Sequence, residues 1–359
     1  MSSRARPSCR ASSERRPTMT RLNNASAPAA SATAVLAAPS PASLPPATRL
    51  RAWLRRYPAA FAIALAVVML AISFIMQPNL SPISQLASFA PLALAAMATA
   101  ASVIGGGIDL SISAQMTLTS ILFVGYLTPA GLGGYEAIVI LAVLGGIVGG
   151  LNGVIVVLLR LPAIVVTLAT MFIITGINLR LAPRPVILFD GWAMDLASSV
   201  WIIPGGLLTI GLPLLLWLLL MRTAFGRNLY AVGGSDATSF SAGINVPIMR
   251  ILSYVVGGII ASIGGLALTA LVSSVDASAS SSYIIGAITA IALGGITLAG
   301  GRGGMIGAIA GAAVIYLVQN MLTIFGVSQV WLNLVFGALL LFAVISSAII
   351  SAPVKEKQA

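Results

Sequence analysis

The chain has 359 residues, of which 58% are hydrophobic and 8% are charged, and its mean hydropathy is +1.05. This composition excludes a soluble globular domain and predicts a polytopic membrane protein. The formal net charge of +11 is concentrated in residues 1–57, which hold ten arginines and one acid, Glu14. A basic tail at the inner face of a membrane accounts for this charge without nucleic acid. The chain has no histidine and one cysteine, Cys9, so neither a metal site nor an internal disulfide is expected.

Both ends of the chain are more polar than its middle. Residues 1–57 are rich in Arg, Ser and Pro, which indicates a disordered cytoplasmic tail. Organelle transit peptides have the same bias, and Met19 is an alternative start, so the place of this tail in the mature protein stays open. Residues 351–359 are expected to form a short cytoplasmic C-terminal tail, and residues 58–350 the membrane domain.

Ten apolar runs follow the N-terminal tail. A helix needs about 20 apolar residues to cross the hydrocarbon core of a bilayer. The third and eighth runs are short enough to be broken or re-entrant, so eight spans is the alternative count. The expected fold is all-α, with about ten transmembrane helices (eight to ten). The runs are Pro58–Met76, Ile83–Ile104, Ser111–Leu127, Ala137–Leu159, Ala163–Leu181, Val200–Met221, Ile248–Leu271, Ile284–Leu298, Gly304–Phe325 and Val330–Ile350.

The charges between the runs favour one orientation. With ten spans and the N-terminus inside, most of the basic residues fall on the cytoplasmic side, as the positive-inside rule requires, and the acids Glu136, Asp190, Asp195 and Asp276 fall outside. Arg180 and Arg184 are the exceptions. We therefore expect both termini in the cytoplasm. The residues placed inside are Arg160, Arg222, Arg227, Arg250, Arg302, Lys355 and Lys357.

An acid stands at a break between two apolar runs, in Gly105-Gly-Gly-Ile-Asp-Leu-Ser-Ile-Ser113. Asp109 is expected to cap a helix that starts at Leu110. A role in ligand or proton binding is less favoured, because proton-coupled carriers place carboxylates in mid-span and every acid here stands at a span edge in the sequence. The break and its cap are assigned to Gly106, Gly107, Asp109 and Ser111.

A polar stretch between Arg222 and Arg250 interrupts the apolar chain. It predicts a short helix that is presented to a partner: a Gly-Gly pair comes first, Ser235 and Asp236 are candidate caps, and Gly243 is a stop signal. The residues assigned to this helix are Gly233, Gly234, Ser235, Asp236, Phe240, Gly243 and Ile244.

Three motifs carry a resemblance to a known family. They are Gly106-Gly-Ile-Asp-Leu-Ser111, the polar loop from Phe225 to Asn245, and Leu293-Gly-Gly-Ile-Thr-Leu-Ala-Gly-Gly-Arg-Gly303. In this order and spacing they closely resemble the ribose-type ABC sugar importer permeases, over about residues 83–350. The resemblance implies the membrane subunit of a bacterial inner-membrane importer, which receives a monosaccharide from a periplasmic binding protein and works by alternating access.

The same resemblance implies the division of labour with other subunits. A separate cytoplasmic ABC ATPase would hydrolyse ATP, and the segment Gly233–Ile244 would be the coupling helix that enters its cleft. The permease itself would be no enzyme and would carry no cofactor, and the sequence accordingly has no G-x-x-x-x-G-K-[ST] phosphate loop. A second permease subunit, identical or not, would complete the pore.

The chain departs from the family pattern after the outer loop that ends at Tyr283. Relatives usually continue with an acidic residue, whereas here Ile284 follows. The departure implies a difference in cargo or a second, non-identical permease.

Polar residues within the spans are candidates for the sugar pathway, since neutral sugars need hydroxyl and amide partners. Hydrogen bonding between helices is the alternative role for each. Two other functions stay open: a permease for branched-chain amino acids, which scarce buried charge argues against, and a secondary carrier that needs no ATPase. The pathway candidates are Gln115, Asn152, Thr167, Thr170, Asn178 and Asn320.

Overall fold

A computed structural model describes residues 57–79, 81–188, 192–277 and 282–351 of the chain. All of these residues belong to the second of two units into which the chain divides, Pro46–Ala359. The two predicted tails, 1–57 and 351–359, lie outside the described residues except for one residue each.

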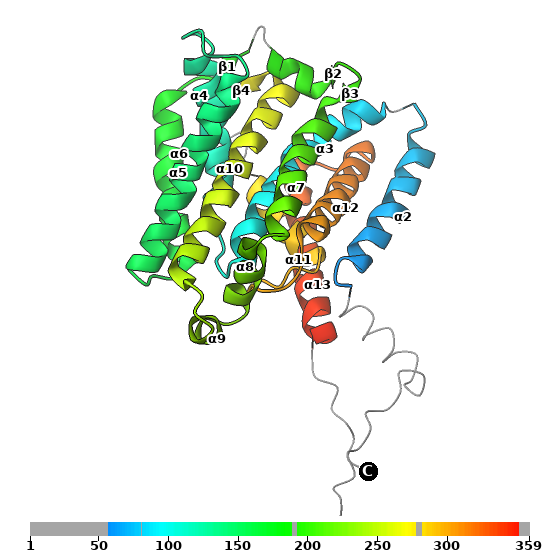
Figure 1. The fold of residues 1–359 in the computed structure, drawn as a ribbon. Coiled ribbons are helices and arrows are strands. Elements are labelled where there is room, and N and C mark those ends of the chain that lie inside the picture. The colour runs from blue at the N-terminus through cyan, green and yellow to red at the C-terminus, as the bar shows by residue number, and fades with distance from the viewer. Residues whose placement is uncertain (1–56, 80, 189–191, 278–281, 352–359) are drawn as a thin grey trace, which may run out of the picture. The chain divides into compact units, whose positions relative to one another are not determined.

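The described unit is a bundle of helices (Figure 1), and each of the ten apolar runs coincides with one of them. Two more helices, α8 (Ala224–Gly234) and α9 (Asp236–Ser241), lie in the polar stretch, and a 3-10 turn, η3 (Trp192–Ala197), precedes α7. The helices of the apolar runs are α2 (Ala60–Met76), α3 (Pro82–Ile104), α4 (Ile112–Leu122) with its π-helical extension η2 (Phe123–Leu127), α5 (Glu136–Leu158), α6 (Ala163–Leu181), α7 (Gly205–Met221), α10 (Val246–Val272), α11 (Tyr283–Leu293), α12 (Met305–Ile324) and α13 (Gln329–Ser351).

The lengths of these helices fit a multi-pass membrane protein. Within the described residues, five helices are long and apolar enough to cross a membrane: α3, α5, α6, α10 and α12. Helix α7 reaches that length together with α8, from which it is bent by 84°. The other apolar segments are shorter: α2, α4 with η2, α11 and the middle of α13. The predicted all-α polytopic fold is confirmed.

Two predicted run boundaries are wrong. The sixth run was expected from Val200, but residues 199–204 pair as the short antiparallel strands β2 (Ser199–Val200) and β3 (Ile203–Pro204). A turn with Trp201 at φ 59° joins them, so α7 starts only at Gly205. The eighth run was expected to reach Leu298, but α11 ends at Leu293, because Gly295 takes a φ of +79° that a helix cannot continue.

Helix α3 forms the centre of the bundle. Nearly all of its residues from Ala90 onward are buried, and it packs against α10, α12, α11 and α7. Helices α5 and α10 approach so closely that a Cβ on Gly258 would lie 2.1 Å from the Gly145 carbonyl oxygen. Glycine at these two positions therefore allows the backbones of α5 and α10 to pack closely.

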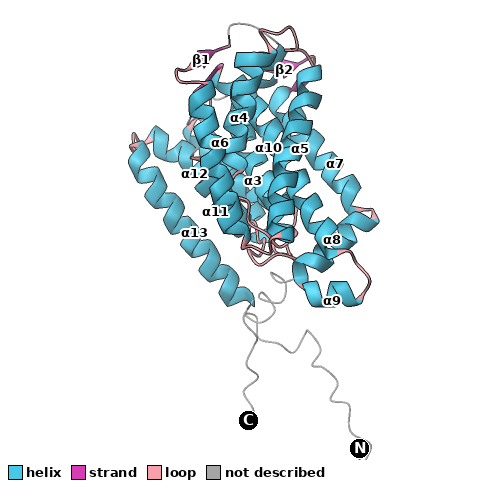
Figure 2. Ribbon diagram, turned by 90° about the vertical axis from the view of Figure 1, so that its left-hand side faces the viewer, coloured by secondary structure: helices cyan, strands magenta, loops and turns pink. Residues whose placement is uncertain are grey.

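The bundle has two distinct ends (Figures 1 and 2). Helices α8 and α9 lie at the same end as the start of α2 and the end of α13. The opposite end carries the strands, where β1 (Val186–Ile187) pairs antiparallel with β4 (Ser274–Val275).

Candidate functional site

Helix α9 has defined signals at both of its ends. Ser235 is the N-cap, and its Oγ accepts a hydrogen bond of 3.4 Å from the Thr238 N–H. At the other end Gly243 has a φ of +77°, and the Ile244 N–H donates to the Ser239 carbonyl at 3.0 Å, the pattern that closes a helix with a left-handed residue. Asp236 is the first residue of the helix and not its cap. Phe240 is 76% exposed, so it is presented outward.

The polar stretch holds a second helix, α8, which the sequence pattern did not predict. Helix α8 starts at the N-cap Thr223, whose Oγ1 accepts from the Phe225 N–H at 3.2 Å. Gly233 and Gly234 are its last residues. Their assignment to the helix of Asp236 is therefore wrong, because the extended backbone of Ser235 separates α8 from α9.

The three glycine-rich motifs meet at one place, which we call the glycine junction and define as Gly106, Gly233, Gly300 and Gly301. A Cβ on Gly233 would lie 1.9 Å from the Ile104 carbonyl oxygen, and one on Gly300, whose φ is +93°, would lie 2.9 Å from the Gly106 Cα. The Gly301 N–H donates to the Ile104 carbonyl at 3.1 Å. The end of α8 thus contacts, through backbone alone, the break between α3 and α4 and the second break, between α11 and α12.

Arg250 links α9 and α10 to this junction. Its Nη2 lies 2.8 Å from Oδ2 of Asp236 and 3.0 Å from Oδ1. The same nitrogen lies 3.5 Å from where a Cβ of Gly106 would be. A polar cavity of about 340 Å³ adjoins the pair, with Arg160 on its other wall. The arrangement connects the exposed helix α9 with the break that carries Asp109.

Asp109 is buried at the start of α4. Its Oδ1 accepts from the Ser111 N–H at 2.9 Å and from the Ser111 hydroxyl at 2.7 Å. Helix α4 begins at Ile112 with Ser111 as N-cap residue, so the expectation that Asp109 caps a helix from Leu110 is wrong by two residues. Asp109 is 3% exposed and lies against α3 and α11, so this acid is buried although it stands beside a break in the sequence.

Two of the pathway candidates extend from Asp109 in a chain of hydrogen bonds. Asn152 on α5 donates from Nδ2 to the Ser111 Oγ at 2.8 Å. Thr170 on α6 donates to the Asn152 Oδ1 at 2.6 Å. We call Asp109, Ser111, Asn152 and Thr170 the Asp109 network. It ties the helix break to α5 and α6.

The remaining pathway candidates are outside this network. Two of them join helices: Gln115 Nε2 donates to the Gly258 carbonyl at 2.8 Å, and Asn178 Nδ2 donates to the Ala114 carbonyl at 3.0 Å. Thr167 Oγ1 donates to the Ile108 carbonyl at 3.2 Å, which joins α6 to the break before α4. Asn320 lies apart, on α12, and its Nδ2 has no hydrogen-bond partner among the described residues.

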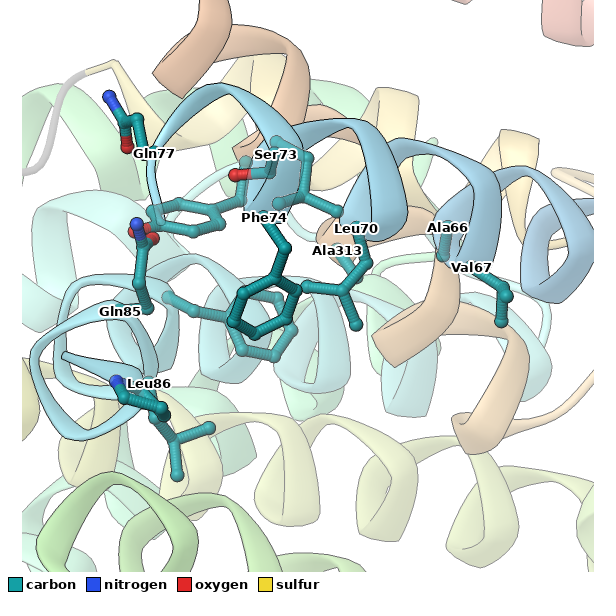
Figure 3. Close-up of a pocket in the computed structure, with 13 residues that line it drawn as sticks. Ala66, Val67, Leu70, Ser73, Phe74, Gln77, Gln85, Leu86 and Ala313 are labelled. Atoms are coloured by element: carbon teal, nitrogen blue, oxygen red, sulfur yellow. The ribbon is translucent and has the colours of Figure 1, made fainter. Parts of the chain in front are cut away.

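A larger cavity, of about 440 Å³, lies between α2, α3 and α12. In Figure 3 the ring of Phe74 projects into it from α2, while Gln77 and Gln85 gather at one end. The Tyr316 hydroxyl donates to the Gln85 Oε1. The other lining residues are mostly apolar, so this cavity offers few partners to a polar cargo, and no pathway candidate lines it.

Comparison with known proteins gives one family over most of the chain. Residues 81–344 match the family described as branched-chain amino acid transport system / permease component. The ribose import permease protein RbsC of Escherichia coli is 30% identical over 82% of this chain and 94% of its own length. RbsC of Bacillus subtilis is 31% identical over 68% of this chain and 77% of its own, and the fructose import permease protein FrcC of Rhizobium meliloti is 31% identical over 67% and 70%. No solved structure matches the chain.

A permease of this kind is the non-catalytic transmembrane subunit of an ABC transporter, and ABC importers combine it with an ATPase and a binding protein. The match covers α3 to α12 and most of α13, including all three glycine-rich motifs. The chain is therefore a multi-pass membrane protein that belongs to the ABC importer permease family whose curated members include the ribose and fructose import permeases.

Proposed function

We propose that this permease carries a monosaccharide such as ribose, delivered by a periplasmic binding protein, into the cytoplasm by alternating access. The observation that carries the proposal is the contact chain from α9 to the helix breaks. The exposed Phe240 belongs to a six-residue helix whose Asp236 binds Arg250, and Arg250 lies beside Gly106 at the glycine junction. A partner that moves α9 would therefore move both breaks.

In this proposal α9 is the coupling helix and its partner is a cytoplasmic ABC ATPase. A short helix with an exposed aromatic side chain fits a cleft on a partner, and rigid helices transmit motion as bodies. The end of the bundle with α8 and α9 is then cytoplasmic, together with both termini, in a bacterial inner membrane. Five arginines of the described residues lie at or near this end, which agrees with the positive-inside rule: Arg160, Arg222, Arg227, Arg250 and Arg302.

The polar side chains buried inside the bundle suit a sugar better than an amino acid. Asp109 is the one buried charged side chain among the described residues, whereas amides and hydroxyls are buried at many positions. A zwitterion would need partners of both signs inside the bundle. A neutral, hydroxyl-rich cargo needs neither a positive nor a negative partner. A permease for branched-chain amino acids, which the family description names, is the second candidate.

Uptake by the reconstituted importer tests the proposal. Proteoliposomes would hold this chain with its ATPase, and the binding protein would be added outside with radiolabelled ribose, fructose, galactose or leucine. ATP-dependent uptake of one sugar and not of leucine is the expected result. Uptake of leucine alone would replace the sugar with the second candidate, and uptake without the ATPase would overturn the importer mechanism.

A further inference from the structure

We propose that Asp109 and Tyr283 form a notch that accepts one hydroxyl group of the passing sugar. The inference rests on the proposed function and names a contact within it. The notch is a cavity of about 10 Å³ between α3, α4 and α11. That is close to the smallest volume that holds one water molecule, and a sugar hydroxyl group is of similar size.

The carboxyl group of Asp109 has an unused acceptor. Ser111 occupies Oδ1 twice, whereas Oδ2 is buried and has no hydrogen-bond partner among the described residues. A buried polar atom without a partner costs about 1–3 kcal/mol, and a hydroxyl group bound at Oδ2 would remove that cost. A hydroxyl group can donate a short hydrogen bond to such a carboxyl oxygen.

The other walls of the notch suit a hydroxyl group as well. Thr99 already donates its own proton to the Ala95 carbonyl at 2.8 Å, so its oxygen is left to accept. The side chains of Thr99, Ser113 and Tyr283 bring the polar part of the lining, and Ala95 and Ala287 keep it open. A hydroxyl group that donates to Asp109 therefore has further polar neighbours.

The notch lies where two short helices begin. Helix α11 has 11 residues, about 16 Å at 1.5 Å per residue, and α4 with η2 runs from Ile112 to Leu127, about 24 Å, so both are shorter than the hydrocarbon thickness of about 30 Å. Their positive N-terminal ends favour a carboxylate beside them. Transporters place such broken helices around the substrate near the middle of the membrane. The start of α4 is also the end of the contact chain from α9, so motion of the coupling helix would reshape the notch.

The test is uptake by the reconstituted importer with Asp109→Asn, which keeps an acceptor for Ser111 and replaces the free acceptor by a donor. The expected result is a fall in sugar uptake of roughly tenfold, with ATP hydrolysis still stimulated by the binding protein. The matched control is Ser120→Ala on the same helix, which removes a hydroxyl bonded to the Gly265 carbonyl and lies outside the notch; its uptake should stay within about twofold. Uptake by Asp109→Asn at the wild-type rate would overturn the notch and leave the proposed function standing. An inactive wild-type importer would instead refute the proposed function.

A second variant decides the matter if Asp109→Asn fails to assemble. Ala95→Val fills the notch from α3 and leaves the carboxyl group in place. Loss of uptake by an assembled Ala95→Val complex supports the notch, and unchanged uptake overturns it.

Monodeoxy analogues of the sugar that is transported best add a direct readout. The wild type should transport one of these analogues slowly, and Asp109→Asn should transport that analogue no more slowly than the wild type does, because the missing hydroxyl and the missing acceptor are partners. Equal additional losses for every analogue would overturn the assignment.

Discussion

Arg250 and Asp236 join the second turn of α10 to the first turn of α9, with one guanidinium nitrogen 2.8 Å and 3.0 Å from the two carboxylate oxygens. The side chains are 31% and 49% exposed, so the pair contributes less than about 1 kcal/mol to the stability of the fold. The pair instead holds α9 against α10, and no other ion pair among the described residues connects α9 to the bundle.

We therefore expect Asp236→Asn and Arg250→Gln to lower sugar uptake about five- to tenfold while the melting temperature changes by no more than about 3 °C. The ATPase should still hydrolyse ATP, so the number of ATP molecules used per sugar should rise. Arg180→Ala, an exposed arginine at the other end of the bundle, is the control. The double reversal Asp236→Arg with Arg250→Asp should recover part of the uptake; a reversal no better than the single variants would argue against the pair.

The glycine junction predicts a sharp difference between two neighbouring residues. A Cβ on Gly233 would lie 1.9 Å from the Ile104 carbonyl oxygen, whereas one on Gly234 would meet nothing within 4 Å. Gly233→Ala should lower the free energy of unfolding by about 2 kcal/mol or more, and Gly234→Ala should leave it unchanged or raise it by about 0.5 kcal/mol. Thermal unfolding of the two purified variants measures this, and equal melting temperatures would contradict the junction.

Substitutions at Gly243 test whether the end of α9 is needed for binding of the ATPase. Its φ of +77° strains any residue with a Cβ, although open space surrounds it. Gly243→Ala should cost about 1 kcal/mol, and Gly243→Asn less, because Asn tolerates this conformation. Copurification with the ATPase should follow the same order, from the native glycine through Asn to Ala. Equal copurification by all three would show that α9 does not bind the ATPase.

Replacing Phe240 should weaken binding of the ATPase without changing the stability of the fold. Since its side chain is 76% exposed, Phe240→Ala should leave the melting temperature unchanged. If α9 enters a cleft on the ATPase, the same variant should weaken that complex at least about tenfold, because aromatic side chains at the centre of an interface contribute 2 kcal/mol or more. Binding of the detergent-solubilised permease to immobilised ATPase measures the change.

The Asp109 network predicts an effect on stability. Thr170→Val removes the donor that Asn152 Oδ1 accepts from, at 2.6 Å, and should destabilise the bundle by about 1–2 kcal/mol. Asn152→Leu should cost more, because it leaves both Thr170 and Ser111 with one partner fewer. Thermal unfolding of the two variants beside the wild type tests the order, and a more stable Asn152→Leu would contradict it.

Much of the fold could be predicted from local pattern. Apolar runs and their polar boundaries gave the ten helices, and Ser235 and Gly243 gave both ends of α9, because these signals act within a few residues of the chain. The boundaries at Val200 and Leu298 were wrong, since strand pairing at Trp201 and the backbone at Gly295 ended the helices against their apolar sequence.

The site depended on contacts that no local pattern reveals. In the sequence Asp109 is a helix cap and Asn152 and Thr170 are separate pathway candidates, and only the packing of α4 against α5 and α6 joins them into one network. The burial of Asp109 was missed for the same reason: it stands at a span edge in the sequence, but α11 begins beside it in space. The motifs that start at Gly106 and Leu293 share the pattern Gly-Gly-Ile-x-Leu, but of the junction glycines only Gly106 lies in it, so the pattern does not predict the contact with Gly233.

The most direct test of the account is ATP hydrolysis by the purified complex of this chain with its ATPase in lipid, with and without sugar-loaded binding protein. The account predicts that a binding protein loaded with one monosaccharide stimulates hydrolysis several-fold, and that Phe240→Ala abolishes the stimulation. A permease that forms no complex with the ATPase, or one that responds only to an amino acid, would contradict the account.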